Sequence, residues 1–236
     1  MTTTSITRRS AALPLTGVVA MAAGAALLLV LQVVPPTNQI SALRRTISEY
    51  ALSDIGWVFD LAVVLVALGS ALGFGALIRQ CRVPARSAAT VFCALWTVGL
   101  LAVIAFPKHD WALGPNSSGS GTIHRAASVV AFVCLPICVL LAAKKVFPHT
   151  PRRRTLSSAL ALASLLWFAV ILGAVAVAAS SGGRWWELIP LGLVEPGMAL
   201  TEVLALISLI FPAGRGVTAG PAGLPEESST ELTRAR

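Results

Sequence analysis

Residues 55–78 read IGWVFDLAVVLVALGSALGFGALI, an apolar run in which Asp60 is the one charged side chain. An α-helix rises 1.5 Å per residue, so about 20 apolar residues cross the hydrocarbon core of a bilayer. No water is present there to satisfy a free backbone amide, and a helix satisfies its amides within its own segment. This stretch therefore predicts a transmembrane helix.

Similar apolar runs recur on both sides of this stretch. Altogether the sequence predicts six spans: 13–34, 55–78, 88–106, 122–143, 156–179 and a last one that ends near Phe211. The composition agrees, because 56% of the 236 residues are apolar, 12% are charged and the mean hydropathy is +0.81, whereas soluble domains carry roughly twice that charged fraction. We expect an all-α, polytopic membrane protein, a compact bundle of six transmembrane helices over residues 13–211.

The segments at the two ends are expected to lie outside the bundle. Residues 1–12 contain Arg8 and Arg9 ahead of the first apolar run, an order that also occurs in signal peptides. That run is as long as a full span and no small-residue cleavage site closes it, so an uncleaved first helix is favoured. Residues 212–236 are rich in Gly, Pro, Ser, Thr and Glu, which predicts a disordered tail.

The basic residues predict the orientation. Thirteen of the 18 lie in the N-terminal segment, the second and fourth connections and the C-terminal tail, and the other five are Arg44, Arg45, Lys108, Arg125 and Arg184. Cationic connections stay on the cytoplasmic side, so both termini are predicted to be cytoplasmic. The basic residues do not share one face with interleaved aromatics, so membrane lipids and no nucleic acid are the expected partners.

Nothing in the sequence predicts a metal or another cofactor. Cys81, Cys93, Cys134 and Cys138 lack the paired spacing of a zinc ribbon. His109, Asp110 and His124 could supply ligands or proton transfer, but a structural zinc site uses three or four ligands at closer spacing. We therefore interpret His109, Asp110 and His124 as polar groups that face water at a helix end.

Most acidic residues fall on the predicted outer side. In the first outer loop, Ile40, Leu43, Ile47 and Ala51 recur at helical spacing, which predicts a short helix lying in the interface. Thr46 and Glu49 also have the spacing of a capping box, in which two side chains satisfy the first amides of a helix. The interfacial helix and the capping box imply different roles for Glu49, and the sequence leaves both open.

The last crossing contains two further carboxylates. Pro is favoured in the first turn of a helix and Glu near its N-terminus, so this helix is predicted to begin near Pro196, with Glu195 beside it and 188–194 in the interface. Glu202 would then lie less than two turns below the helix start. Because an ionisable group in a span is costly, Glu202 is the carboxylate with the strongest indication of a function.

The order of several short motifs resembles a bacterial membrane family, domain of unknown function 998, and in particular its actinobacterial members. The resemblance covers about residues 41–211 and is carried by Thr46 to Leu52, Gly56-Trp57, Phe106-Pro107 with Asp110, His124-Arg125 with Phe132 and Pro136, and more weakly Gly197 to Glu202. It implies a compact six-helix bundle in the bacterial plasma membrane, with these residues gathered at the outer face and no assigned activity.

These observations leave three hypotheses open. The first is an outer-facing polar pocket that binds a lipid head group or small ligand, formed by Ser48, Glu49, Tyr50, Asp110, His124, Arg125 and Glu202. The second is a membrane hydrolase or transferase for lipid-linked substrates, with His124 as general base, Asp110 or Glu202 orienting it, and Ser48 as nucleophile. The third is an accessory subunit that contacts another membrane protein.

Overall fold

The predicted six-helix architecture is confirmed by the computed structural model, which describes residues 3–109 and 118–211. Within these ranges six helices are long and apolar enough to cross a membrane. They are α1 (Thr3–Val30), α2 (Gly56–Arg79), α3 (Ala88–Ala105), α4 (Gly119–Val146), α5 (Pro151–Ser181) and α6 (Leu191–Ile210), with short 3-10 helices η1 (Thr37–Gln39), η2 (Ile47–Leu52) and η4 (Trp185–Glu187) in the connections.

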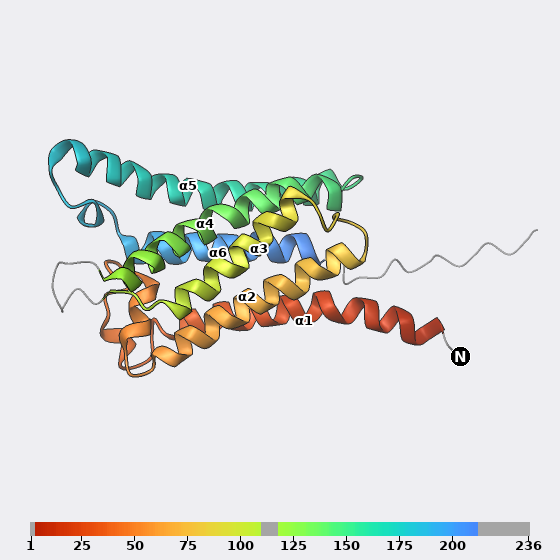
Figure 1. Ribbon diagram of the computed structural model, residues 1–236, viewed down its shortest axis with the longest axis horizontal. Coiled ribbons are helices and arrows are strands. Elements are labelled where there is room, and N and C mark those ends of the chain that lie inside the picture. The colour runs from red at the N-terminus through yellow and green to blue at the C-terminus, as the bar shows by residue number, and fades with distance from the viewer. Residues whose placement is uncertain (1–2, 110–117, 212–236) are drawn as a thin grey trace, which may run out of the picture.

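The six helices run along one long axis and pack side by side (Figure 1). α1 packs on α2, α3 on α4, and α5 on both α4 and α6. The α1–α2 contact depends on small residues: a Cβ added to Gly69 would lie 2.7 Å from the Gly17 carbonyl oxygen. Helices in a bilayer associate through such close backbone approach, since lipid supplies no hydrophobic force between them.

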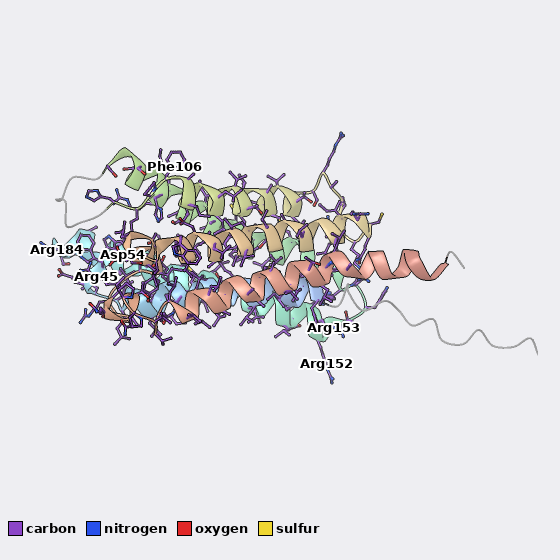
Figure 2. The ribbon with its side chains drawn as sticks, turned by 90° about the horizontal axis from the view of Figure 1, so that it is seen from below. Arg45, Asp54, Phe106, Arg152, Arg153 and Arg184 are labelled. Carbon is purple, nitrogen blue, oxygen red and sulfur yellow. The ribbon has the colours of Figure 1, made fainter. Side chains whose placement is uncertain are left out.

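The connections at one end of the bundle carry most of the polar residues discussed below. Figure 2 shows Arg45, Asp54 and Arg184 at this end and Arg152 and Arg153 at the opposite end. We call the first the outer end, following the charge distribution. The alternation of the six helices agrees with both termini lying on one side, while the cytoplasmic orientation itself stays a prediction.

Several helices begin or end away from the predicted residues, for local reasons. The first span ends at Val30 rather than residue 34. The fourth begins at Gly119 rather than residue 122, because Ser118 is a good N-cap and its Oγ accepts a hydrogen bond from Gly121 N at 3.0 Å. The fifth begins at Pro151 rather than residue 156, since proline is well suited to the first position of a helix.

The first outer connection differs from both predictions made for it. Its ordered helix is the 3-10 helix η2, while residues 42–45 form turns rather than an interfacial α-helix. The capping box is also wrong, because Thr46 makes no side-chain cap bond. Its hydroxyl instead accepts a hydrogen bond from Lys108 Nζ, and Glu49 pairs with the same ammonium group at 3.0 Å.

The sixth helix begins earlier than predicted, at Leu191 rather than near Pro196. Residues 191–194 are therefore the first turn of α6, while the prediction that 188–194 lies in the membrane interface stays a prediction. Gly192 explains the early start: its N–H donates to the Leu43 carbonyl at 3.1 Å, and a Cβ there would collide with the Ala42 carbonyl. This contact fastens the first outer connection onto α6.

Candidate functional site

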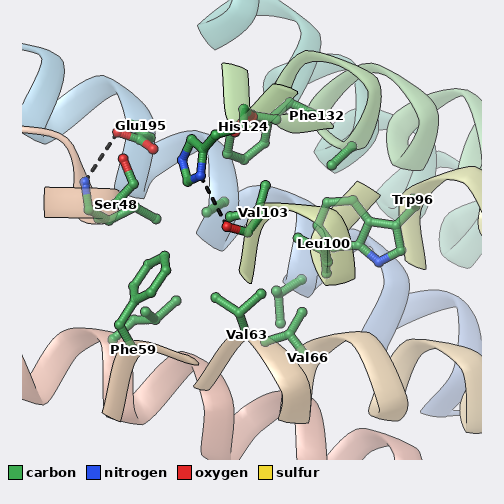
Figure 3. A pocket seen from close by; sticks show the side chains of 16 residues that line it. Ser48, Phe59, Val63, Val66, Trp96, Leu100, Val103, His124, Phe132 and Glu195 are labelled. Atoms are coloured by element: carbon green, nitrogen blue, oxygen red, sulfur yellow. Dashed lines mark hydrogen bonds between the residues drawn. The ribbon is translucent and has the colours of Figure 1, made fainter. Parts of the chain in front are cut away.

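A cavity of about 60 Å³ opens inside the outer half of the bundle (Figure 3). Its wall comes from α1, η2, α2, α3, α4 and α6, and most of it is apolar. The polar lining residues are Ser48, His124, Ser128 and Glu195. A water molecule needs roughly 10–15 Å³ of such a cavity, so the cavity holds about four waters or a small organic group.

The inner end of the cavity is closed by a buried tryptophan. Trp96 is 2% exposed and its Nε1 donates to Ser70 Oγ at 3.1 Å, while that hydroxyl donates to the Val66 carbonyl at 2.7 Å. A buried indole N–H needs such a partner, and here the partner also fixes the ring. The cavity therefore has a polar outer end and an apolar, aromatic inner end.

His124 is held by the end of α3. Its Nδ1 lies 3.0 Å from the carbonyl oxygens of both Val103 and Phe106. In a continuing helix the Val103 carbonyl would accept from the amide of residue 107, but Pro107 has no N–H. The imidazole supplies the missing donor, which explains why the Phe106-Pro107 motif and His124 belong together.

These bonds determine which nitrogen faces the cavity. Both partners of Nδ1 are carbonyl acceptors, so Nδ1 carries the proton. Nε2 makes no hydrogen bond to any residue that the structure describes, and in Figure 3 it lies on the side of Ser48 and Glu195. In its neutral form the ring therefore presents the Nε2 lone pair to the cavity.

Glu195 stands opposite the imidazole on α6. Its Oε2 accepts a hydrogen bond from Ile47 N at 3.1 Å, which ties η2 to the first turns of α6. Its Oε1 has no hydrogen-bond partner in the part of the chain described. No ion pair within 4.0 Å joins this carboxyl group to His124, so a gap remains between the two groups that a ligand atom or water can bridge.

Ser48 connects the cavity to a polar network above it. Its hydroxyl shares a 3.1 Å hydrogen bond with Thr46 Oγ1, which accepts from Lys108 Nζ. Lys108 also pairs with Glu49 at 3.0 Å, and Arg45 lies 3.5 Å from the same carboxylate oxygen. This network fixes η2 over the outer end of the cavity.

Tyr50 packs behind this network. It is 3% exposed, and burial raises the pKa of its phenol, as do the carboxylates of Glu195 and Glu49. The phenol is therefore protonated at any physiological pH. Tyr50 does not line the cavity, and we assign it to the packing of η2.

The structure brings some of the predicted site residues together and separates others. Ser48 and His124 line the cavity, while Glu49 and Tyr50 lie beside it on η2. Arg125 is exposed and outside the lining. The predicted contribution of Asp110 falls outside the described residues.

Glu202 does not belong to this cavity. It is fully buried, and its Oε1 accepts a hydrogen bond from Ser164 of α5 at 2.8 Å. Its Oε2 has no partner among the described residues. At this depth Ala199 and Val203 are the α6 residues that face the cavity, so Glu202 is turned toward α5 instead.

Glu195 and Ser128 are the polar cavity residues that the predicted site does not include, and Glu195 is the ionisable one. Its position before Pro196 suggested a helix start in the interface. Because α6 begins at Leu191, Glu195 lies inside the helix and faces the bundle. The signal that could have indicated it is the rarity of a carboxyl group within a span.

Ser48 and His124 do not form a hydrogen-bonded nucleophile–base pair in the part of the chain described. A nucleophile and its base lie within hydrogen-bond reach of each other, although that distance is often longer without substrate. Across the described residues, the hydroxyl of Ser48 bonds to Thr46 and not to His124. His124 is oriented by two backbone carbonyls, and Glu202 is too far into the α5–α6 contact to orient it.

Comparison with known proteins agrees with the architecture. A family model described as "Protein of unknown function (DUF998)" matches residues 18–212. No curated protein and no solved structure matches. The matched range includes all of α2 to α6 and the whole lining of the cavity. The chain therefore belongs to the DUF998 family of proteins of unknown function.

Proposed function

We propose that this membrane protein binds a small amphiphile with an uncharged, hydroxyl-bearing head group in the cavity. The observation that carries the proposal is that His124 Nε2 and Glu195 Oε1 line one cavity without partners of their own among the described residues. Neither atom is enclosed by protein, because Glu202 Oε2 is the one buried side-chain N or O atom without a partner in the part of the chain described. Both face the cavity, so their hydrogen bonds come from water or from a ligand that fills the cavity, and two such atoms at one place favour a ligand with polar hydrogens.

The chemistry of the polar end selects the head group. The neutral imidazole nitrogen accepts a hydrogen bond, and the Glu195 carboxyl group and the Ser48 hydroxyl can accept or donate one. A diol or glycerol head suits this set, because each of its hydroxyls can both donate and accept across the gap. A phosphate head is disfavoured, because Glu49 already pairs with Lys108, the nearest cation of the network.

The remainder of the wall favours a hydrocarbon chain. Phe59, Trp96 and Phe132 come from three helices and line the cavity with aliphatic residues between them. Ligand sites are commonly apolar with a few convergent polar groups that fix orientation. The predicted outer position further supports an amphiphile of the outer leaflet of the plasma membrane as the partner.

The test uses tritiated monocaprin, which has a glycerol head, and purified protein in phosphatidylcholine nanodiscs. Two substitutions remove one acceptor each and keep the structural bond. His124→Asn places an amide nitrogen where Nδ1 donates, and Glu195→Gln retains an oxygen for Ile47 N. Each is expected to weaken binding about tenfold, since a hydrogen bond to a charged or buried group contributes about 1.5 kcal/mol.

Glu187→Gln is the matched control. Glu187 lies at the same end of the bundle, does not line the cavity, and pairs with Arg184 at 60% side-chain exposure. Its substitution should leave monocaprin binding unchanged. Absence of saturable binding, or equal affinity of the wild type, His124→Asn and Glu195→Gln proteins, contradicts the proposal.

A further inference from the structure

A second cavity of about 40 Å³ adjoins the first between α1 and α6. Four residues line both cavities: Leu28, Ile47, Ala199 and Val203. The two spaces are therefore separated by single side chains and not by a helix. When these side chains change rotamer, the two cavities can join without any movement of the backbone.

The second cavity reaches the surface that faces lipid. Its lining includes Leu29 and Leu200, which are 53% and 42% exposed, on α1 and α6 respectively. These side chains lie within the apolar spans, where hydrocarbon and not water surrounds the protein. Gln32, beyond the end of α1, is the polar residue of the lining, and the rest of the lining is apolar. At the depth of Ala25, Leu29 and Leu200 a lipid hydrocarbon chain is the occupant that suits the gap.

We propose that the gap between α1 and α6 is a lateral window, through which the hydrocarbon tail of the bound amphiphile passes from the cavity into the bilayer. The inference rests on the proposed function and adds the class of ligand: a single-chain amphiphile whose tail is longer than the cavity can enclose. The head stays at Ser48, His124 and Glu195, and the tail leaves past Ala199 and Leu200.

The path requires no opening of the bundle at its outer end. There η2 is fastened by the Gly192–Leu43 and Ile47–Glu195 hydrogen bonds and by the Lys108–Glu49 ion pair. Entry from water would have to break these contacts. Entry from the bilayer displaces only side chains, and a tail that remains in the bilayer keeps its own hydrophobic environment.

Photolabelling with monoolein that carries a diazirine at the end of its chain tests the window. Protein in phosphatidylcholine nanodiscs is irradiated at a probe concentration below saturation, and labelled residues are identified by mass spectrometry. Labels are expected on Leu29 and Leu200 in excess of Leu204, which is the matched residue one turn along α6: it is also 42% exposed but lines neither cavity.

The His124→Asn protein separates a bound tail from bulk lipid. Labelling at Leu29 and Leu200 should fall toward the Leu204 level, about tenfold for the loss of one hydrogen bond to the head. Labels concentrated on Trp96 and Leu100 would mean that the tail points inward, and labels at the window that do not respond to His124→Asn would mean bulk lipid only. Either result overturns the window.

Monocaprin binding distinguishes this failure from failure of the proposed function. If monocaprin binding depends on His124 but the window is not labelled above Leu204, the cavity binds its ligand and the lateral route is wrong. If monocaprin does not bind saturably at all, the proposed function fails first, and the inference about its tail fails with it.

Discussion

The bond between His124 and the end of α3 can be tested by a double-mutant cycle with Pro107. His124 is 4% exposed, and His124→Ala leaves the carbonyl oxygens of Val103 and Phe106 without their donor. An unsatisfied buried polar group costs about 1–3 kcal/mol, and the Phe106 bond is only partly buried, so the single substitution should destabilise the protein by about 2–4 kcal/mol. Pro107→Ala restores an amide that can donate to Val103 by extending α3 one residue.

In the Pro107→Ala background the cost of His124→Ala should therefore be smaller by about 1 kcal/mol. Any effect of the proline on the unfolded chain cancels in the cycle, because it occurs with and without His124. The free energies of unfolding are measured in mixed micelles of dodecylmaltoside and sodium dodecyl sulfate. Additive costs, with a coupling below about 0.3 kcal/mol, would refute the reasoning that the imidazole replaces the amide missing at Pro107.

Four further substitutions test the packing, the outer network and the limits of the site. Gly69→Ala should destabilise the protein by about 1–3 kcal/mol, because its Cβ meets the α1 backbone. A Cβ at Gly75 meets nothing within 4 Å, so Gly75→Ala should stabilise the protein by about 0.5–1 kcal/mol. Equal effects of the two substitutions on the free energy of unfolding would contradict the α1–α2 packing. Lys108→Gln should cost about 1 kcal/mol, because its ion pair with Glu49 is only partly exposed, 14% and 18%, and this difference from wild type should shrink in high salt. Glu202→Gln keeps the bond from Ser164 and should leave monocaprin binding unchanged, so a loss of binding would show that the cavity extends to α5.

The bundle could be predicted from the sequence because span length and charge alternation are one-dimensional signals. An apolar run such as 55–78 needs no partner to be recognised as a span. The ends of the helices are not visible in hydropathy, because they depend on single side chains: Ser118 caps α4, and Gly192 lets α6 begin next to the Leu43 carbonyl. Such contacts are tertiary and leave little trace in hydropathy.

The candidate site could be predicted only in part. Ser48 and His124 lie in the same cavity, and both were predicted from their outer position. Glu202 and Glu195 show what the sequence does not predict. The depth of a residue in the membrane can be read from its position in a span, but the side of the helix on which it lies cannot. In a helix that is apolar on every side, no polar face indicates which neighbour a residue contacts. Only the packing shows that Glu195 faces the cavity and Glu202 faces α5.

Nitrogen NMR of the histidine side chains tests the central claim most directly. The chain has three histidines, so selective ¹⁵N-histidine labelling gives few resonances, and His124→Asn assigns those of His124. The account predicts a proton on Nδ1, none on Nε2, and a change at Nε2 alone when monocaprin is added, as a head-group hydroxyl donates to it. A proton on Nε2 in the free protein, or His124 resonances that do not respond to saturating monocaprin, would contradict the account.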